Sequence, residues 1–345
     1  MKKTLGYLAL VCGAAAAAPQ INVQGRADYR YDMRSEAVDN QRDNNGFDLQ
    51  YARLDVKGNA NEDLNYRLRL RFDFASQSVS PDGKTAVVKD TLKGSAGYID
   101  MLYAKQKLPM GFSVTAGKFF SGRCGWEGET SGMDLYQTTL VYAATAGAYQ
   151  TPLGVQPAWE GFGQNVSFLV ANSGVKWGAD PGEQHYLMVG GVWKGTFLKG
   201  AIQPNLSLIY MPVKHLGNGQ YLANVGLRSN VGIFGGELEW KSFGDSTNAK
   251  GDMPFVQSYS ALAKVDLGMF RPQVRFIYDN KSILDEKKSL EQVSVSPVLE
   301  IVPFPKSTFR WHVGYSMLDV IPKGSNDYIY NKVFAGMSMN LDVMK

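Results

Sequence analysis

The most constraining feature of the sequence is a strict alternation of apolar and polar side chains. From residue 64 to residue 74 every second position is apolar, and the polar positions between them include Arg67, Arg69 and Arg71. A period of two places successive side chains on opposite faces of a β-strand. This segment is therefore predicted to be a strand with one apolar face and one charged face.

Three further segments, residues 25–34, 308–318 and 332–343, have the same period. Such alternation is expected in a soluble sandwich, whose apolar face forms the core, and in a membrane barrel, whose apolar face meets lipid. Length separates the two, because sandwich strands usually have about 5–6 residues whereas membrane strands need about 9–11. Each run has ten residues or more. We therefore predict an all-β fold, a transmembrane antiparallel β-barrel.

The spacing of these segments predicts about sixteen strands. The predicted strands begin near residues 22, 47, 64, 96, 112, 148, 165, 185, 201, 221, 236, 256, 271, 290, 307 and 329. Short connections, such as 59–63 and 108–111, alternate with long ones, such as 76–96. Outer-membrane barrels have an even number of strands, short periplasmic turns and longer outer loops. The stretch 143–165 has no clean period, so its strand boundary is the least defined.

Composition excludes several other classes of protein. The mean hydropathy is −0.21 and no long apolar run follows residue 18, which excludes a bundle of membrane-spanning helices. A net charge of +4 is too small to indicate a nucleic-acid partner. Two cysteines are too few for a disulfide framework or a zinc ribbon.

The first residues indicate export. Lys2 and Lys3 precede an apolar stretch at 4–13 and a run of alanines at 14–18. This is the three-part pattern of a secretory signal peptide, and the alternative is an uncleaved anchoring helix. We predict cleavage after Ala17, which leaves one barrel domain over residues 18–345. That domain is expected in the bacterial outer membrane, in contact with its lipid.

Residues 47–76 carry a pattern that is specific to one family. The block ARL-x-V-x-G at 52–58 is followed by a turn and by a strand of alternating basic and apolar residues that ends in DFA. This pattern resembles the phosphate-selective porin O/P family, and the resemblance continues through GYI at 97–99 and VTAGKF at 114–119. It implies a sixteen-stranded trimeric porin whose third outer loop folds into the lumen. The matching loop here is residues 121–147.

Positive side chains dominate the predicted lumen face of the first three strands, with eight basic positions against four aspartates. Fixed positive charge in a lumen favours anions, whereas interleaved arginines and aspartates also pair across neighbouring strands. Both interpretations stay open, and Glu237, Glu239 and Glu300 on later strands oppose the excess. The predicted pore-lining residues are Arg26, Arg30, Arg53, Arg67, Arg69, Arg71, Lys118, Arg275 and Arg310.

The predicted inner loop supplies candidates for the narrowest part of the pore. Its segment 121–130 contains Arg123, Glu127 and Glu129 between several glycines, which allow a chain to bend sharply. If the loop folds inward, these three constriction-loop side chains face the narrowest water column. The alternative is an ordinary exposed outer loop.

Nothing in the sequence indicates an enzyme. His185, His215 and His312 lie in separate segments without a nucleophile motif nearby, and His312 is expected to be a solvated lumen side chain. No cofactor and no metal site is predicted.

The expected function is that of a porin, a water-filled channel through which small hydrophilic solutes or inorganic anions diffuse passively. The lumen charges predict a modest anion preference, and the family resemblance implies a homotrimer. The alternative is a structural or surface-receptor barrel without an open pore.

Overall fold

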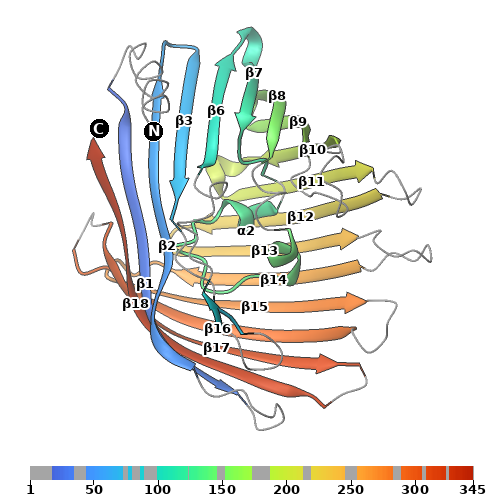
Figure 1. Ribbon diagram of the computed structural model, residues 1–345. Helices are drawn as coiled ribbons and strands as arrows, with labels where there is room; N and C mark the ends of the chain where they lie inside the picture. The colour runs from blue at the N-terminus through green and yellow to red at the C-terminus, as the bar shows by residue number, and fades with distance from the viewer. Residues whose placement is uncertain are drawn as a thin grey trace.

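The alternating segments form strands that close into one antiparallel barrel (Figure 1). The computed structural model describes residues 18–34, 44–72, 77–79, 86–88, 99–122, 124–145, 152–172, 187–212, 219–244, 255–282, 289–304, 308–323 and 326–344. The predicted signal peptide, residues 1–17, lies outside these ranges. Within them, sixteen strands form the barrel, and each pairs with its neighbours in chain order.

The barrel strands are β1 (Gln20–Arg34), β2 (Asn44–Asn59), β3 (Leu64–Arg71), β6 (Ile99–Lys107), β7 (Phe112–Lys118), β8 (Leu153–Gly161), β9 (Gln164–Asn172), β10 (Leu187–Gly195), β11 (Ile202–Pro212), β12 (Gly219–Val231), β13 (Phe234–Gly244), β14 (Phe255–Val265), β15 (Phe270–Ser282), β16 (Leu290–Ile301), β17 (Arg310–Pro322) and β18 (Tyr328–Met344). A separate two-stranded sheet pairs β4 (Gln77–Val79) with β5 (Ala86–Val88). Two short helices, α2 (Gly125–Glu129) and α3 (Leu140–Ala144), lie between β7 and β8.

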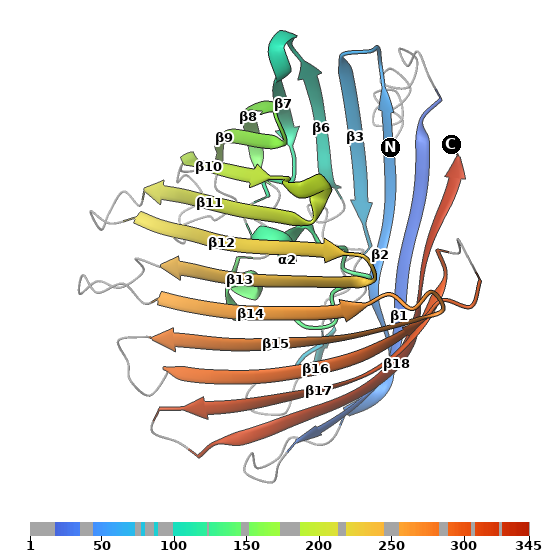
Figure 2. The same ribbon diagram turned by 180° about the vertical axis from the view of Figure 1, so that it is seen from behind.

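The first and last strands close the barrel. Ile21 at the start of β1 pairs with Met344 at the end of β18, and Gln20 pairs with Lys57 near the short turn after β2. The start of β1 and the end of β18 therefore lie at the end of the barrel that carries the short turns. Figure 2 shows β11 to β17 running side by side, from β11 to the neighbour of β18. Because short turns are periplasmic in outer-membrane barrels, the longer connections belong to the outer surface.

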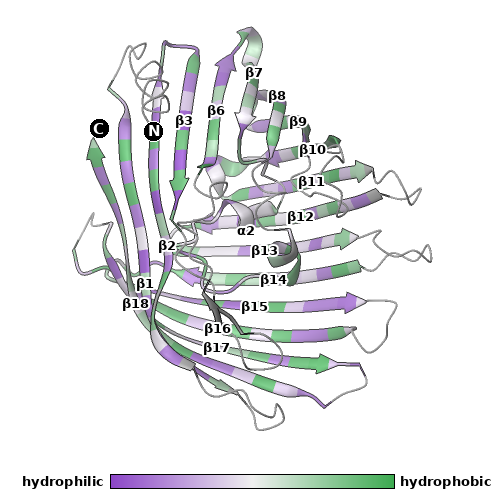
Figure 3. Cartoon of the chain, in the orientation of Figure 1, coloured by the Kyte–Doolittle hydropathy of each residue, from purple (hydrophilic) through white to green (hydrophobic). Residues whose placement is uncertain are grey.

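Hydrophobic and hydrophilic residues alternate along the barrel strands (Figure 3), and the exposed apolar side chains place the apolar face on the outside of the barrel. On β18, Val333, Met337 and Leu341 are exposed to the outside, whereas Phe334 and Ser338 are buried inside. This distribution of apolar and polar side chains is the reverse of that in a soluble protein, and it fits a wall that faces lipid. No helix among the described residues combines the length and the apolarity needed to cross a bilayer.

The observed strand boundaries confirm the fold class and the strand number that the alternation predicted. Fifteen of the sixteen barrel strands begin within three residues of the predicted start. The exception is β8, which begins at Leu153 instead of residue 148, in the stretch without a clean period.

Candidate functional site

The described part of the connection between β7 and β8, residues 121–122 and 124–145, lies in the interior of the barrel and is called the inner loop below. Its helices α2 and α3 contact β11 to β14 from the inside (Figure 1). The sequence predicted an inward-folded loop over residues 121–147. Three sets of contacts hold it against the barrel wall.

The first set is a buried ionic cluster around Glu127. The Nζ of Lys241 on β13 lies 2.6 Å from Glu127 Oε2 and 2.8 Å from Glu239 Oε2, and all three side chains are buried. Arg275 lies 3.6 Å from the other Glu127 oxygen. Burial alone would raise the pKa of Glu127, but Lys241 and Arg275 outweigh burial and lower it, so the carboxylate stays ionised.

The backbone of the inner loop completes this cluster. Glu239 accepts hydrogen bonds from the backbone N–H groups of Trp126 and Glu127, at 2.6 and 3.1 Å. Glu127 in turn accepts from the backbone N–H and the hydroxyl of Thr139, both at 2.8 Å. The carboxylates therefore connect α2, the N-cap of α3 and the barrel wall in one network.

The second set of contacts lies on the opposite wall, at β1, β16 and β18. The hydroxyl of Tyr136 donates to Glu300 at 2.8 Å, and its ring stacks under the Arg26 guanidinium, 4.2 Å from the ring centroid. Arg26 also donates to the carbonyl of Leu135 at 3.0 Å and pairs with Asp28. The inner loop thus bridges the lumen and is attached at both sides.

The third set is an apolar core inside the barrel. Phe119, Cys124 and Val141 of the connection between β7 and β8 pack against inward side chains of β9 to β13, namely Leu169, Ala171, Met188, Ile209, Met211, Leu222 and Phe243. Apolar packing of this kind excludes water. The flank of the lumen next to β9–β13 is therefore filled at this level, and the open space lies elsewhere.

A glycine at the start of α2 permits the close approach of the inner loop to the wall. Gly125 has a φ of +62°, and a Cβ there would lie 2.0 Å from Glu239 Oε1 and 2.4 Å from Asn224 Oδ1. Gly232 in the β12–β13 turn has a similar φ of +59° with nothing within 4 Å of a Cβ.

These two glycines give a matched prediction. We expect Gly232→Ala to lower the free energy of unfolding by about 1–2 kcal/mol, the cost of a left-handed residue. We expect Gly125→Ala to lower it further, because the added methyl group also displaces Glu239. Urea unfolding of both variants in the same lipid measures the difference. Equal losses would show that the inner loop does not depend on this contact.

A first water-accessible cavity of about 610 Å³ lies between the inner loop and the wall of β1, β2, β3 and β6. We call it the arginine cavity. Its charged lining comprises Arg26, Arg53, Arg67, Arg69, Arg71, Lys194, Asp100 and Glu129. Six cations thus face two carboxylates.

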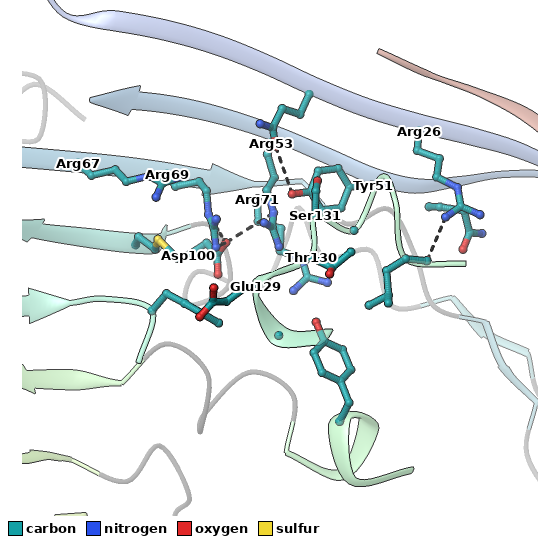
Figure 4. Close-up of a pocket in the computed structure, with 18 of the residues that line it drawn as sticks. Arg26, Tyr51, Arg53, Arg67, Arg69, Arg71, Asp100, Glu129, Thr130 and Ser131 are labelled. Atoms are coloured by element: carbon teal, nitrogen blue, oxygen red, sulfur yellow. Dashed lines mark hydrogen bonds and ion pairs between the residues drawn. The ribbon is translucent and has the colours of Figure 1, made fainter. Parts of the chain in front are cut away.

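Two of these arginines pair with one carboxylate, that of Asp100 (Figure 4). Arg69 lies 2.6 Å from Asp100, and Arg53 lies 3.6 Å from the same oxygen. Arg53 is directly opposite Arg71 in the pairing of β2 with β3. Like charges directly opposite each other destabilise a sheet. This wall therefore concentrates positive charge at a cost in stability. Arg67 differs, because it donates two hydrogen bonds to Asp55.

Asp100 enters the cavity through a β-bulge. In the pairing of β3 with β6, Arg69 is opposite Met101 and Leu70 is opposite Ile99, so Asp100 is an additional residue. Both Asp100 and Met101 are buried, whereas Ile99 and Leu102 are exposed. A bulge re-aims a side chain in this way, and alternation alone does not predict it.

A second cavity of about 630 Å³ lies on the other side of the tip of the inner loop. The two cavities share Glu129, Thr130 and Ser131. The charges of the second cavity are balanced; they are Arg228, Lys264, Arg271, Arg310, Glu129, Asp134, Glu237, Asp266 and Glu300. Residues 129–131 therefore stand between a positive compartment and a mixed one.

Most of the predicted site residues lie on the inner side of the wall. Arg26, Arg53, Arg67, Arg69 and Arg71 line the arginine cavity, and Arg310 lines the second cavity. Arg275 joins the Glu127 cluster, and Arg30 lies opposite the inward-facing Phe334. Glu129 lines both cavities and pairs with Lys194. Other residues of the site were not predicted from the sequence pattern; they are Asp100, Tyr136, Lys194, Arg228 and Lys241.

Two predicted placements are wrong, and a third predicted site residue lies outside the described part of the chain. Lys118 is on the outer face, because its partners in the sheet, Leu102 and Leu153, are both exposed there. Its ammonium donates to the carbonyl of Ile99 at 2.6 Å. Glu127 faces the wall and not the water. Arg123 is outside the described residues, as are the histidines at 185 and 215.

The expectation for His312 is also wrong. His312 is buried, and its Nε2 lies 2.8 Å from Asp28 Oδ1. Its ring contacts Tyr136 edge to face, with 5.1 Å between the ring centroids. The inner loop covers this histidine and keeps it away from the water.

A closed barrel of sixteen strands with an apolar outer face and charged inner cavities defines an outer-membrane porin. Residues 21–196 match the model of the family described as phosphate-selective porin O and P. Because the match spans slightly more than half of the chain, the protein belongs to this family. It is a channel of the bacterial outer membrane, and this family and fold are those of non-enzymatic channels.

Solved porins have the same fold. The outer-membrane channel DcaP of Acinetobacter baumannii is 10% identical with a TM-score of 0.66, and the alignment covers 95% of this chain and 99% of that chain. OmpT of Vibrio cholerae is 11% identical with a TM-score of 0.60, covering 94% and 99%. OmpF of Salmonella typhi, in complex with daunomycin, is 12% identical with a TM-score of 0.58, covering 92% and 97%. No curated protein sequence gives a significant match.

Proposed function

We propose that this porin passes small hydrophilic solutes by passive diffusion with a modest preference for anions. The observation that carries the proposal is the arginine cavity, where six cationic side chains face two carboxylates. Fixed positive charge beside a narrow water path raises the local concentration of anions. The family's description makes inorganic phosphate one candidate solute among the small anions.

The preference is expected to be modest for two structural reasons. Arg67 is paired with Asp55, and Lys194 is paired with Glu129. The second cavity has nearly equal numbers of positive and negative side chains. Salt screens what remains, because the Debye length falls from about 30 Å at 0.01 M to about 3 Å at 1 M.

The zero-current potential across a bilayer with a tenfold KCl gradient tests the proposal. We expect the wild type to prefer chloride at low salt, Arg53→Gln/Arg71→Gln to reduce the potential, and Asp100→Asn to increase it. The control is Arg271→Gln, because Arg271 pairs with Asp266 in the balanced second cavity and both side chains are well exposed. This control is expected to leave the potential nearly unchanged.

Other outcomes of the same recording contradict parts of the proposal. A cation-selective wild type, or a double variant with the wild-type potential, removes these arginines from the mechanism. Stable ohmic steps are expected from an open pore. Their absence would favour the alternative of a structural or receptor barrel without an open pore.

We also propose that the chain is exported, that residues 1–17 are removed and that the mature barrel forms a homotrimer. The basic, apolar and small-residue regions before Ala18 support the first two statements. The trimer rests on the family resemblance. All three remain predictions.

A further inference from the structure

The periplasmic turns on one side of the barrel carry bulky apolar residues at their tips. Met110 lies between β6 and β7, Phe162 between β8 and β9, and Leu198 between β10 and β11. Their exposed fractions are 84%, 97% and 73%. These are three successive turns of the same rim, so together they form an apolar edge, called the apolar rim below.

The backbone conformation at these positions is unfavourable for the residues that occupy them. Met110, Phe162 and Leu198 have φ values of 61°, 52° and 49°. Glycine, asparagine and aspartate are the residues that suit such turns, and a bulky residue there is an outlier. The sequence keeps strained apolar residues at exposed tips, which points to a use for their side chains.

Strand β7, above the apolar rim, is the shortest of the barrel strands as the structure describes them. It has seven residues and is flanked by described residues at both ends, whereas β1 has fifteen and β18 has seventeen. At about 3.3 Å per residue and a tilt near 40°, seven residues rise roughly 18 Å, against an apolar band of about 25 Å. The wall at β7 is therefore too low to span the hydrocarbon by itself.

The side chains on the outer face of β7 show at which end of the strand the apolar band can be extended. Its outward side chains are Phe112, Val114, Ala116 and then Lys118, whose charge ends the apolar band at the outer side. The band is therefore extended only at the periplasmic end, where Met110 follows. A span shorter than the bilayer is costly unless the bilayer thins or other apolar surface fills the gap.

The apolar rim is continuous with the lipid-facing aromatic side chains. Phe112 is opposite Trp159 in the pairing of β7 with β8, and the ring of Trp159 lies 6.4 Å from that of Phe162. Lys107 and Lys199 flank the same turns. An apolar edge with adjacent cations fits the phosphates and acyl chains of a phospholipid surface.

We propose that Met110, Phe162 and Leu198 insert into the phospholipid of the inner leaflet. They extend the apolar band at and beside β7, and this membrane contact compensates for the low wall there. The proposal concerns anchoring in the bilayer and is independent of which solute the pore passes.

Depth-dependent quenching tests the insertion directly. A bimane label is attached to Phe162→Cys in a Cys124→Ala background, and the protein is reconstituted in phosphatidylcholine vesicles that contain a doxyl-labelled phospholipid. Quenching is expected to be at least twofold stronger than for a label at Glu62→Cys in the β2–β3 turn, which is exposed and polar. Quenching by aqueous iodide instead would overturn the proposal. Protection from both quenchers would also overturn it, because another protein surface would then cover the tip.

A stability measurement gives a second test with opposite signs. Phe162→Asn creates an Asn-Gly turn, which relieves the backbone, so a tip in water predicts a higher urea midpoint in every lipid. Insertion predicts a lower midpoint in bilayers with 18-carbon chains and a smaller loss or none in bilayers with 12-carbon chains. The control is Leu267→Asn in the turn between the longer strands β14 and β15, where no dependence on thickness is expected. A rise in midpoint in both bilayers would exclude insertion.

Discussion

Replacing Lys241 by methionine is expected to lower the free energy of unfolding by about 3–5 kcal/mol, the usual cost of removing one partner from a buried ion pair. Lys241 is fully buried and is the cation nearest to both Glu127 and Glu239. Without it, the cation that the described residues still place beside the two carboxylates is Arg275, which is 3.6 Å from Glu127. Urea unfolding in detergent or lipid measures the loss.

The same substitution is expected to release α2 from the wall, so single-channel recordings should show a larger and noisier conductance. The control is Lys194→Met, which breaks the partly exposed pair with Glu129 and is expected to cost less than about 1 kcal/mol. Equal losses for the two lysines would show that the Glu127 cluster does not hold the inner loop in place.

A charge on the lipid face of β3 is expected to impair assembly severely. Leu68 is opposite Leu102, which is exposed on the outer face, so Leu68→Arg faces the hydrocarbon. Near the bilayer midplane this change costs about 2–4 kcal/mol. Folding yield into vesicles, measured by the heat-dependent shift on a gel, gives the effect.

The neighbouring substitution tests the register. Arg69→Leu removes one of the two arginines beside Asp100, but that carboxylate still lies in the water-accessible arginine cavity. It is therefore expected to be tolerated better than Leu68→Arg. A greater loss for Arg69→Leu would mean that the inner and outer faces of β3 are exchanged.

The strands of this barrel could be predicted because each one has one face toward lipid and one toward water. Apolar and polar residues therefore alternate along its sequence. The rule fails where both faces are apolar. On β9, Phe168 and Val170 face outward and Leu169 packs under the inner loop, so the run has no period. The apolar core depends on a contact with a distant segment of the chain, and no local pattern contains that information.

The candidate site could be predicted only in part, for similar reasons. The arginines of β2 and β3 have the parity of the inner face, and they line the water-accessible arginine cavity. Lys118 does not follow the rule that a charged side chain faces the lumen, because a strand end near the headgroups tolerates a lysine on the outer face. Glu127 and Tyr136 of the inner loop act through contacts with residues on distant barrel strands. The sequence does not identify those partners.

The bulge in β6 has a consequence for how channels of this kind diverge. Asp100 is an extra residue, so its deletion would leave Ile99 facing outward and Met101 facing inward, as they do now. A single codon lost or gained at this point changes the charge beside Arg53 and Arg69 by one unit without exchanging any other side chain. Ion preference in such a barrel can therefore evolve through strand length as well as through substitution.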